Sequence, residues 1–189
     1  MLFELAQRND IELPYTTPAE QNVVYVEPFF DPQGHTTRGA DSAVEHLQMA
    51  EPYLDWIVGV GLDSDEADNP TSKFADVFRD ARAMGLKLTM HCDVNQKDIV
   101  AHMRECLDVI EVDRLDHGIS ALDDARLVEA LQQHDIGLTI CPISNRFVVQ
   151  TLTGDEIRRF LQAGIKATVN SHDPTYFRGY MSENLAAEI

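Results

Sequence analysis

The sequence has few basic residues, and this shortage restricts what the protein can bind. Its 189 residues contain 15 Lys and Arg against 32 Asp and Glu, which gives a formal net charge of -17. So acidic a surface repels nucleic-acid backbones and anionic membranes. We therefore expect no nucleic acid and no membrane among its partners, and a small molecule or another protein instead.

Long apolar runs and a regular cysteine pattern are also missing. No run reaches the roughly 18 to 20 apolar residues that a membrane-spanning helix requires. The three cysteines, Cys92, Cys106 and Cys141, are odd in number and widely spaced, and no secretory leader precedes them. We expect free thiols and a cytoplasmic location. A composition of 44% hydrophobic and 25% charged residues predicts a single globular domain over residues 1–189.

Short β-branched runs alternate with amphipathic helical segments from about residue 23 onward. This order is typical of βα units around a parallel sheet. The predicted strands are 23–30, 57–62, 86–91, 114–117, 137–141 and 167–170. The predicted helices are 41–53, 72–84, 96–109, 123–134 and 154–163, and Gly85 and Gly164 stand where helix C-caps are expected.

Polar residues cluster just after the predicted strands, and their placement separates two α/β architectures. The clusters are Asp31 and His35, Asp63 to Glu66, His91 and Asp93, Asp116 and His117, Ser144 and Asn145, and His172 and Asp173. No glycine-rich phosphate turn of a nucleotide-binding sheet is present. Active sites of (β/α)₈ barrels are built from the carboxyl ends of strands, so we favour part of such a barrel over an open doubly wound sheet. Ordinary polar loops are the alternative.

Three histidines in these clusters are candidates for chemistry. His91 ends an apolar strand, where its imidazole can ligate a metal or transfer a proton, or can be a structural histidine. His117 lies in Leu-Asp-His-Gly, where it can hold or deprotonate a water, or simply end a strand. His172 and Asp173 end another strand, and Pro174 prevents its continuation. Here chemistry is the favoured interpretation.

Seven segments in order carry a family resemblance. They are residues 2–9 with their FELA run, FFDPQGH at 29–35, VGVGLDS at 58–64, PTSKF at 70–74, RLDHG at 114–118, CPISN at 141–145 and VNSHDPTYF at 169–177. With these motifs the chain resembles the adenosine/adenine deaminase family of the amidohydrolase superfamily. Its GLDSDE stretch at 61–66 and its DPTYF ending are most similar to the adenine deaminase branch.

The resemblance implies a zinc-dependent hydrolytic deaminase of a 6-aminopurine (adenine, adenosine or an N6-substituted analogue) acting in purine salvage. Zinc lowers the pKa of a bound water toward about 7, which makes it a nucleophile at neutral pH. By resemblance, His91 and His172 are metal ligands, and His117 orients or deprotonates the water. Asp173 is both catalytic and substrate-binding by resemblance, and Glu66 lies in the base-binding pocket.

The chain departs from the family pattern at several positions. The His-x-His motif that supplies two further zinc ligands, on the first barrel strand, is not in these residues. Val94 stands where the family has a catalytic glutamate, although Asp93 is adjacent, and His172 replaces a zinc-binding aspartate. About six of eight βα units are recognised, so we expect an incomplete barrel that lacks the first strand, an internal helix and strand, and the C-terminal helices.

Three explanations of these departures stay open: part of a longer enzyme, a degenerate relative that no longer deaminates, or a shortened form. The alternative to catalysis is therefore an inactive relative that binds purines or forms a homo-oligomer. An unrelated metal-dependent barrel hydrolase, such as a phosphoesterase, is a third interpretation. The adjacent Ser171, His172 and Asp173 are no nucleophilic triad, because neighbouring residues cannot adopt its geometry.

Overall fold

Six parallel strands form the centre of the described part of the molecule. The computed structural model describes residues 29–30, 40–63, 70–92, 98–148 and 154–187. The strands are β1 (Phe29–Phe30), β2 (Gly59–Val60), β3 (Lys87–Cys92), β4 (Arg114–His117), β5 (Gly137–Ile140) and β6 (Ala167–Val169), paired in chain order. Leu115 of β4 pairs with Met90 of β3 and with Leu138 of β5. This register brings the carboxyl ends of the strands to one edge of the sheet.

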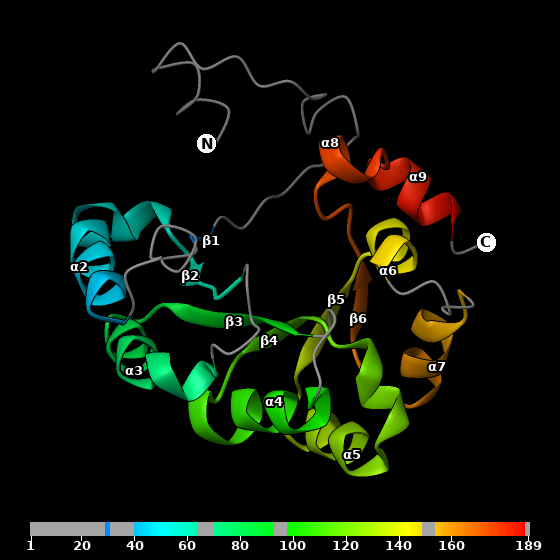
Figure 1. The fold of residues 1–189 in the computed structure, drawn as a ribbon, viewed down its shortest axis with the longest axis horizontal. Helices are drawn as coiled ribbons and strands as arrows, with labels where there is room; N and C mark the ends of the chain where they lie inside the picture. Colours follow the sequence, from blue (N-terminus) through cyan, green and yellow to red (C-terminus); the bar gives the residue numbers. More distant parts are fainter. Residues whose placement is uncertain (1–28, 31–39, 64–69, 93–97, 149–153, 188–189) are drawn as a thin grey trace.

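Helices follow the strands and lie outside the sheet. The α-helices are α2 (Ala40–Ala50), α3 (Ala75–Ala83), α4 (Ile99–Glu105), α5 (Ala125–Gln133), α6 (Pro142–Val148), α7 (Glu156–Gln162), α8 (Pro174–Phe177) and α9 (Met181–Ala186). Shorter turns are the 3₁₀ segments η2 (Glu51–Trp56), η3 (Thr71–Phe74) and η5 (Ile119–Asp123), and the π-helical η4 (Cys106–Ile110). In Figure 1, α2, α3, α4, α5 and α7 form an arc around the strands, while α6, α8 and α9 lie together near the end of β6.

All six predicted strands are found, with shorter bounds for most of them. The helix expected over 41–53 ends at Ala50 and continues as η2, because Pro52 cannot donate to the α-helical ladder. The helix expected over 96–109 divides into α4 and η4. Residues 23–28 of the first predicted strand lie outside the described residues. The helices α6, α8 and α9 were not predicted.

The two predicted glycine caps are confirmed. Gly85 and Gly164 have φ angles of +85° and +74°, in the left-handed region that glycine adopts without a steric penalty. After α3, the Gly85 amide donates to Arg82 O and the Leu86 amide donates to Ala81 O. This pair of bonds is a Schellman motif, and the same pattern follows α7. Both caps turn the chain directly into the next strand.

The core lies between the strands and the outer helices. Leu88, Leu115 and Leu138 from three adjacent strands are at most 1% exposed, and Phe78 of α3 and Phe160 of α7 pack in the same cluster. Each such side chain contributes about 1.5–3 kcal/mol when fully buried. No disulfide links the three cysteines, as expected, and all three are buried. None of the helices within the described ranges combines the length and the apolar character that crossing a bilayer demands.

Candidate active site at the carboxyl ends of the strands

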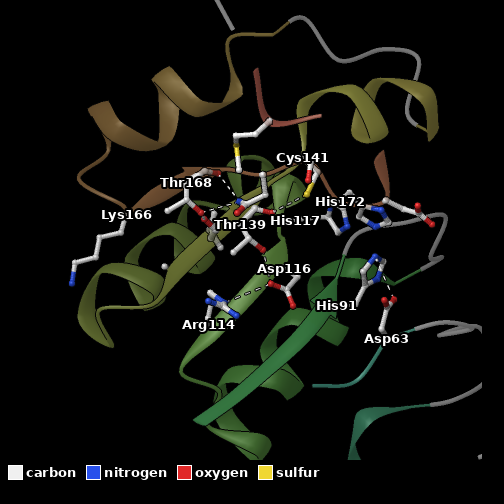
Figure 2. A pocket seen from close by; sticks show the side chains of 16 residues that line it. Asp63, His91, Arg114, Asp116, His117, Thr139, Cys141, Lys166, Thr168 and His172 are labelled. Atoms are coloured by element: carbon white, nitrogen blue, oxygen red, sulfur yellow. Dashed lines mark hydrogen bonds and ion pairs between the residues drawn. The ribbon is translucent and has the colours of Figure 1, made fainter. Parts of the chain in front are cut away.

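A cavity of about 980 Å³ lies on the inner side of the sheet. At one end it is lined by the three candidate histidines and by Asp63, and at the other by Arg114 and Lys166 (Figure 2). Figure 2 shows the histidine rings turned toward one another, from three different strand ends. The cavity is large enough for a purine, because small-molecule sites typically occupy about 300–1,000 Å³.

His91 reaches the cavity from the end of β3. Its amide donates to Leu62 O at 2.9 Å, which fixes the strand beside β2. Its side chain is 11% exposed, and Nε2 lies 3.8 Å from Asp63 Oδ1. The sheet therefore aims one nitrogen of His91 at the cavity, with a carboxylate close by.

His117 is the most buried of the three histidines. It ends β4 with a φ of 63°, an unusual value for a residue other than glycine and one that is often found at functional sites. Nδ1 lies 2.5 Å from Oδ1 of Asn145, a residue of α6. With the Asn145 amide in this orientation, Oδ1 can only accept, so Nδ1 donates and the lone pair is on Nε2.

Burial keeps His117 uncharged. Burial and the neighbouring His91 and His172 lower the pKa of His117 to about 3, more than the bond to Asn145 raises it. At neutral pH its ring can accept a hydrogen bond or ligate a cation. A base this weak is suited to holding a water in place rather than to taking its proton.

His172 and Asp173 follow β6. His172 has a φ of 58°, and its ring packs 5.2 Å from that of Phe177. Burial and the nearby His91 lower the pKa of His172. Asp173 lines the cavity and also caps α8, since its Oδ1 accepts from the Tyr176 amide at 3.3 Å. One carboxylate oxygen is thus committed to the backbone.

The three imidazoles form one cluster. The ring centre of His117 lies 4.5 Å from that of His91 and 5.1 Å from that of His172. One nitrogen of each lies within 4.8 Å of the others, so the three can hold a metal ion together. Uncharged imidazole nitrogens suit zinc.

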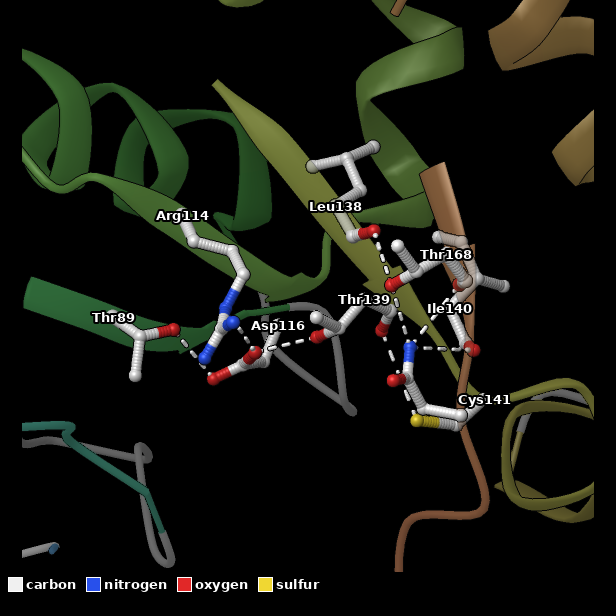
Figure 3. Close-up of polar contacts among 9 residues, drawn as sticks. Thr89, Arg114, Asp116, Leu138, Thr139, Ile140, Cys141 and Thr168 are labelled. Carbon is white, nitrogen blue, oxygen red and sulfur yellow. Dashed lines mark hydrogen bonds and ion pairs between the residues drawn. The ribbon is translucent and has the colours of Figure 1, made fainter. Parts of the chain in front are cut away.

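Asp116 joins three strands below this cluster. Its carboxylate accepts hydrogen bonds from the hydroxyls of Thr89 on β3, at 2.8 Å, and Thr139 on β5 (Figure 3). Arg114 Nε lies 3.7 Å from it. These bonds from Thr89 and Thr139 to Asp116 therefore fix the strands that carry His91 and His117 relative to each other.

The structure brings together four of the five predicted site residues. His91, His117, His172 and Asp173 line one cavity, whereas Glu66 lies outside the described residues. Val94 and Asp93 also lie outside them. The sequence marks Asn145 as a polar residue after a strand and as the end of the CPISN segment. Its bond to His117 follows from neither, because it depends on α6, which the sequence pattern does not predict.

Comparisons with known proteins identify the family and the fold of the chain. The family model for adenosine deaminase matches residues 39–188. The chain is 39% identical to an uncharacterized deaminase of Schizosaccharomyces pombe, over 88% of the chain and 60% of the relative. It is 36% identical to the adenine deaminase of a Marinomonas species, over 100% of the chain and 68% of the relative. It thus spans about 60–68% of the length of these two relatives.

Two solved structures have the same fold. An adenine deaminase from Arthrobacter aurescens superposes with a TM-score of 0.75 at 27% identity, covering 97% of this chain and 80% of that one. A zinc-containing amidohydrolase from Burkholderia ambifaria superposes with a TM-score of 0.71 at 27% identity, covering 85% of this chain and 44% of that one. The expected fold class, a (β/α)₈ TIM-barrel type present in part, is confirmed. On the family match and the identities together, the chain belongs to the adenosine deaminase family.

Proposed function

We propose that this protein catalyses hydrolytic deamination of a 6-aminopurine (adenine, adenosine or an N6-substituted analogue) with one zinc ion, as a step of purine salvage in the cytoplasm. One observation carries the proposal: three imidazoles from three strand ends share a cavity of about 980 Å³ with Asp173. Adenine deaminases are among the relatives, and a zinc-containing amidohydrolase shares the fold.

The residues fit a zinc ion. His91 and His172 would hold it, and His117 lies close enough to be a third ligand or to bind the attacking water. Zinc, when bound, would act as a Lewis acid that lowers the pKa of a water, so that this water becomes a nucleophile able to attack an aromatic carbon at neutral pH. With imidazole at 172 in place of a carboxylate, the site carries one more positive charge, which attracts an anionic nucleophile more strongly.

The protein's own groups then position water and purine. Nε2 of His117, oriented through Asn145, accepts a hydrogen bond from the water. Asp173, at the rim, hydrogen-bonds the purine with the carboxylate oxygen that does not cap α8. We place Glu66 at the base-binding pocket on the family resemblance alone.

The test is conversion of a 6-aminopurine. Purified protein loaded with zinc is incubated with adenine, adenosine and an N6-substituted adenine, and ultraviolet absorbance reports formation of hypoxanthine or inosine. Turnover should disappear in His91→Asn and persist in His134→Asn, a matched change of a histidine that is exposed and outside the cavity. Lack of product at high enzyme concentration would contradict the proposal.

A second function is favoured by Val94, whose side chain cannot donate the proton that the family's glutamate supplies. In this alternative the protein binds purines or forms a homo-oligomer and does not catalyse deamination. Calorimetry with adenine and size-exclusion chromatography test it: binding or a defined oligomer without turnover would support it, and tightly held zinc with turnover would exclude it.

A further inference from the structure

A second cluster of metal-binding side chains lies on the other face of β3. Cys92, His102 and Cys106 each offer one donor atom, and these atoms all lie within 4.8 Å of one another. Successive residues of a strand point to opposite faces, so His91 faces the cavity while Cys92 faces the helices outside the sheet. The cluster is therefore separate from the candidate active site.

Local structure brings the three residues together. His102 lies in α4, and Cys106 begins η4 four residues later, so both side chains share one face of a continuous helical segment. That face packs on the end of β3, where His102 Nε2 lies 3.5 Å from His91 O. π-helical turns such as η4 are rare and often occur at functional sites.

The sulfur spacing suits a shared metal ion. Sγ of Cys92 lies 3.5 Å from Sγ of Cys106, and one thiol donates to the other sulfur. Two thiolates on a tetrahedral zinc ion, each at about 2.3 Å, are about 3.8 Å apart. A disulfide requires about 2.05 Å, so oxidation would need a larger shift than metal binding.

Burial and charge also favour a thiophilic divalent ion. Cys92 and Cys106 are 0% exposed and His102 is 9% exposed. Two thiolates balance the charge of a divalent cation, and a neutral imidazole adds none, so the loaded cluster would have no net charge. A hard cation such as Mg²⁺ would bind weakly, because it prefers oxygen ligands.

We propose that Cys92, His102 and Cys106 form a second, structural metal site for a thiophilic divalent cation of the zinc class. On binding, each thiol releases its proton to solvent, and two thiolates and one ring nitrogen hold the ion. The ion joins β3 to the α4–η4 segment directly beside His91, so it stabilises the strand end that carries the active-site ligand. The site is independent of whether the protein deaminates purines.

Cadmium is the probe that separates the two sites. Bound to thiolate, it gives a sulfur-to-metal absorption band in the ultraviolet, and nitrogen ligands alone give none. Titrating the reduced, metal-free full chain should produce this band, saturating at one ion per chain. The three-histidine cluster can take up cadmium without adding to the band.

Three variants locate the site. Cys106→Ser should remove most of the band and weaken cadmium binding at least roughly tenfold. Cys141→Ser makes the same chemical change at a buried thiol outside the cluster and should keep the band. His102→Gln leaves both thiols in place and should weaken cadmium binding. It gives an independent test of the site if Cys106→Ser does not fold. Circular dichroism checks that each variant folds.

Three outcomes would overturn the proposal. The first is a wild-type protein with no sulfur band, and the second is a band that survives in Cys106→Ser and disappears in Cys141→Ser. The third is a Cys92–Cys106 disulfide, found by mass spectrometry without reductant, in a protein that takes no cadmium once reduced. That last result would make the cysteines a redox pair.

Discussion

The two ends of the sheet are built for different purposes. At the carboxyl ends, the imidazole rings of His91, His117 and His172 lie together around a cavity. At the amino ends, charges are paired: Lys87 at the start of β3 binds Asp113 before β4, at 2.7 Å. Such a division is typical of barrels, whose carboxyl-end loops carry catalysis and whose opposite end carries stability. Substitutions at the two ends should accordingly change different measurements.

The largest change is expected at position 94, two residues after the last residue of β3 in the sequence. Val94→Glu would restore the proton donor that the family resemblance places there, and general acid catalysis contributes roughly 10²–10⁴-fold in rate. We expect the initial rate of purine deamination, followed by ultraviolet absorbance, to rise by that order. Val94→Gln is the matched control, because the glutamine amide is as large as the glutamate carboxyl group but does not transfer a proton.

An unchanged rate in zinc-loaded Val94→Glu would mean that the carboxyl ends are not assembled for catalysis. The carboxyl ends of the strands would then no longer differ from the amino ends in carrying catalysis. The purine-binding alternative would gain accordingly.

The second prediction concerns pH and the buried His117. Its pKa is about 3 in the folded protein and about 6.5 when unfolded, so the unfolded chain binds the extra proton between these values. The stability of the metal-free protein should therefore fall as pH falls below about 6.5. From pH 6.5 down to pH 4.5, protonation of His117 alone should lower the free energy of unfolding by roughly 2–3 kcal/mol, measured in urea with a chelator.

The control is a variant that removes this titration. His117→Asn should flatten the pH dependence of the free energy of unfolding. Equal slopes in wild type and His117→Asn would show that burial does not hold this histidine uncharged.

The third prediction concerns the middle of the sheet. Asp116→Ala removes the acceptor of two hydroxyls, those of Thr89 and Thr139. Leaving partly buried donors without a partner should cost about 2 kcal/mol of stability in urea unfolding. Thr168→Val is the comparison. The exposed Thr168 hydroxyl donates to Leu138 O at 3.4 Å and accepts from Asn170 Nδ2 at 2.9 Å. Water can replace both bonds, so we expect a change below about 0.5 kcal/mol. Equal losses in both would contradict a special role for Asp116.

The sequence predicted the strand ends better than the connections between them. Apolar runs bounded by helices located all six strands, and parallel pairing then placed His91, His117 and His172 side by side. The bond between His117 and Asn145 depends on α6, a helix of 7 residues that carries little periodic signal. The meeting of Cys92 with Cys106 depends on how α4 packs on β3 and on the π-helical turn, and neither follows from local propensity.

The smallest effect is expected at the amino ends. Asp113 is partly buried, which raises the pKa of its carboxyl, but bonds from Lys87 and from the Leu88 amide at 2.9 Å outweigh this and lower it. Because the folded pKa is below the unfolded one, the stabilisation is present above about pH 4 and is lost as pH falls through the folded value.

At pH 7, Asp113→Asn should lose about 1 kcal/mol of unfolding free energy, measured in urea, with the rate of deamination unchanged. Asp135→Asn breaks the fully solvated pair with Lys166 and should change stability by less than about 0.5 kcal/mol. A loss of activity in Asp113→Asn without a loss of stability would erase the distinction between the two ends, because a stabilising pair would then be acting on the chemistry.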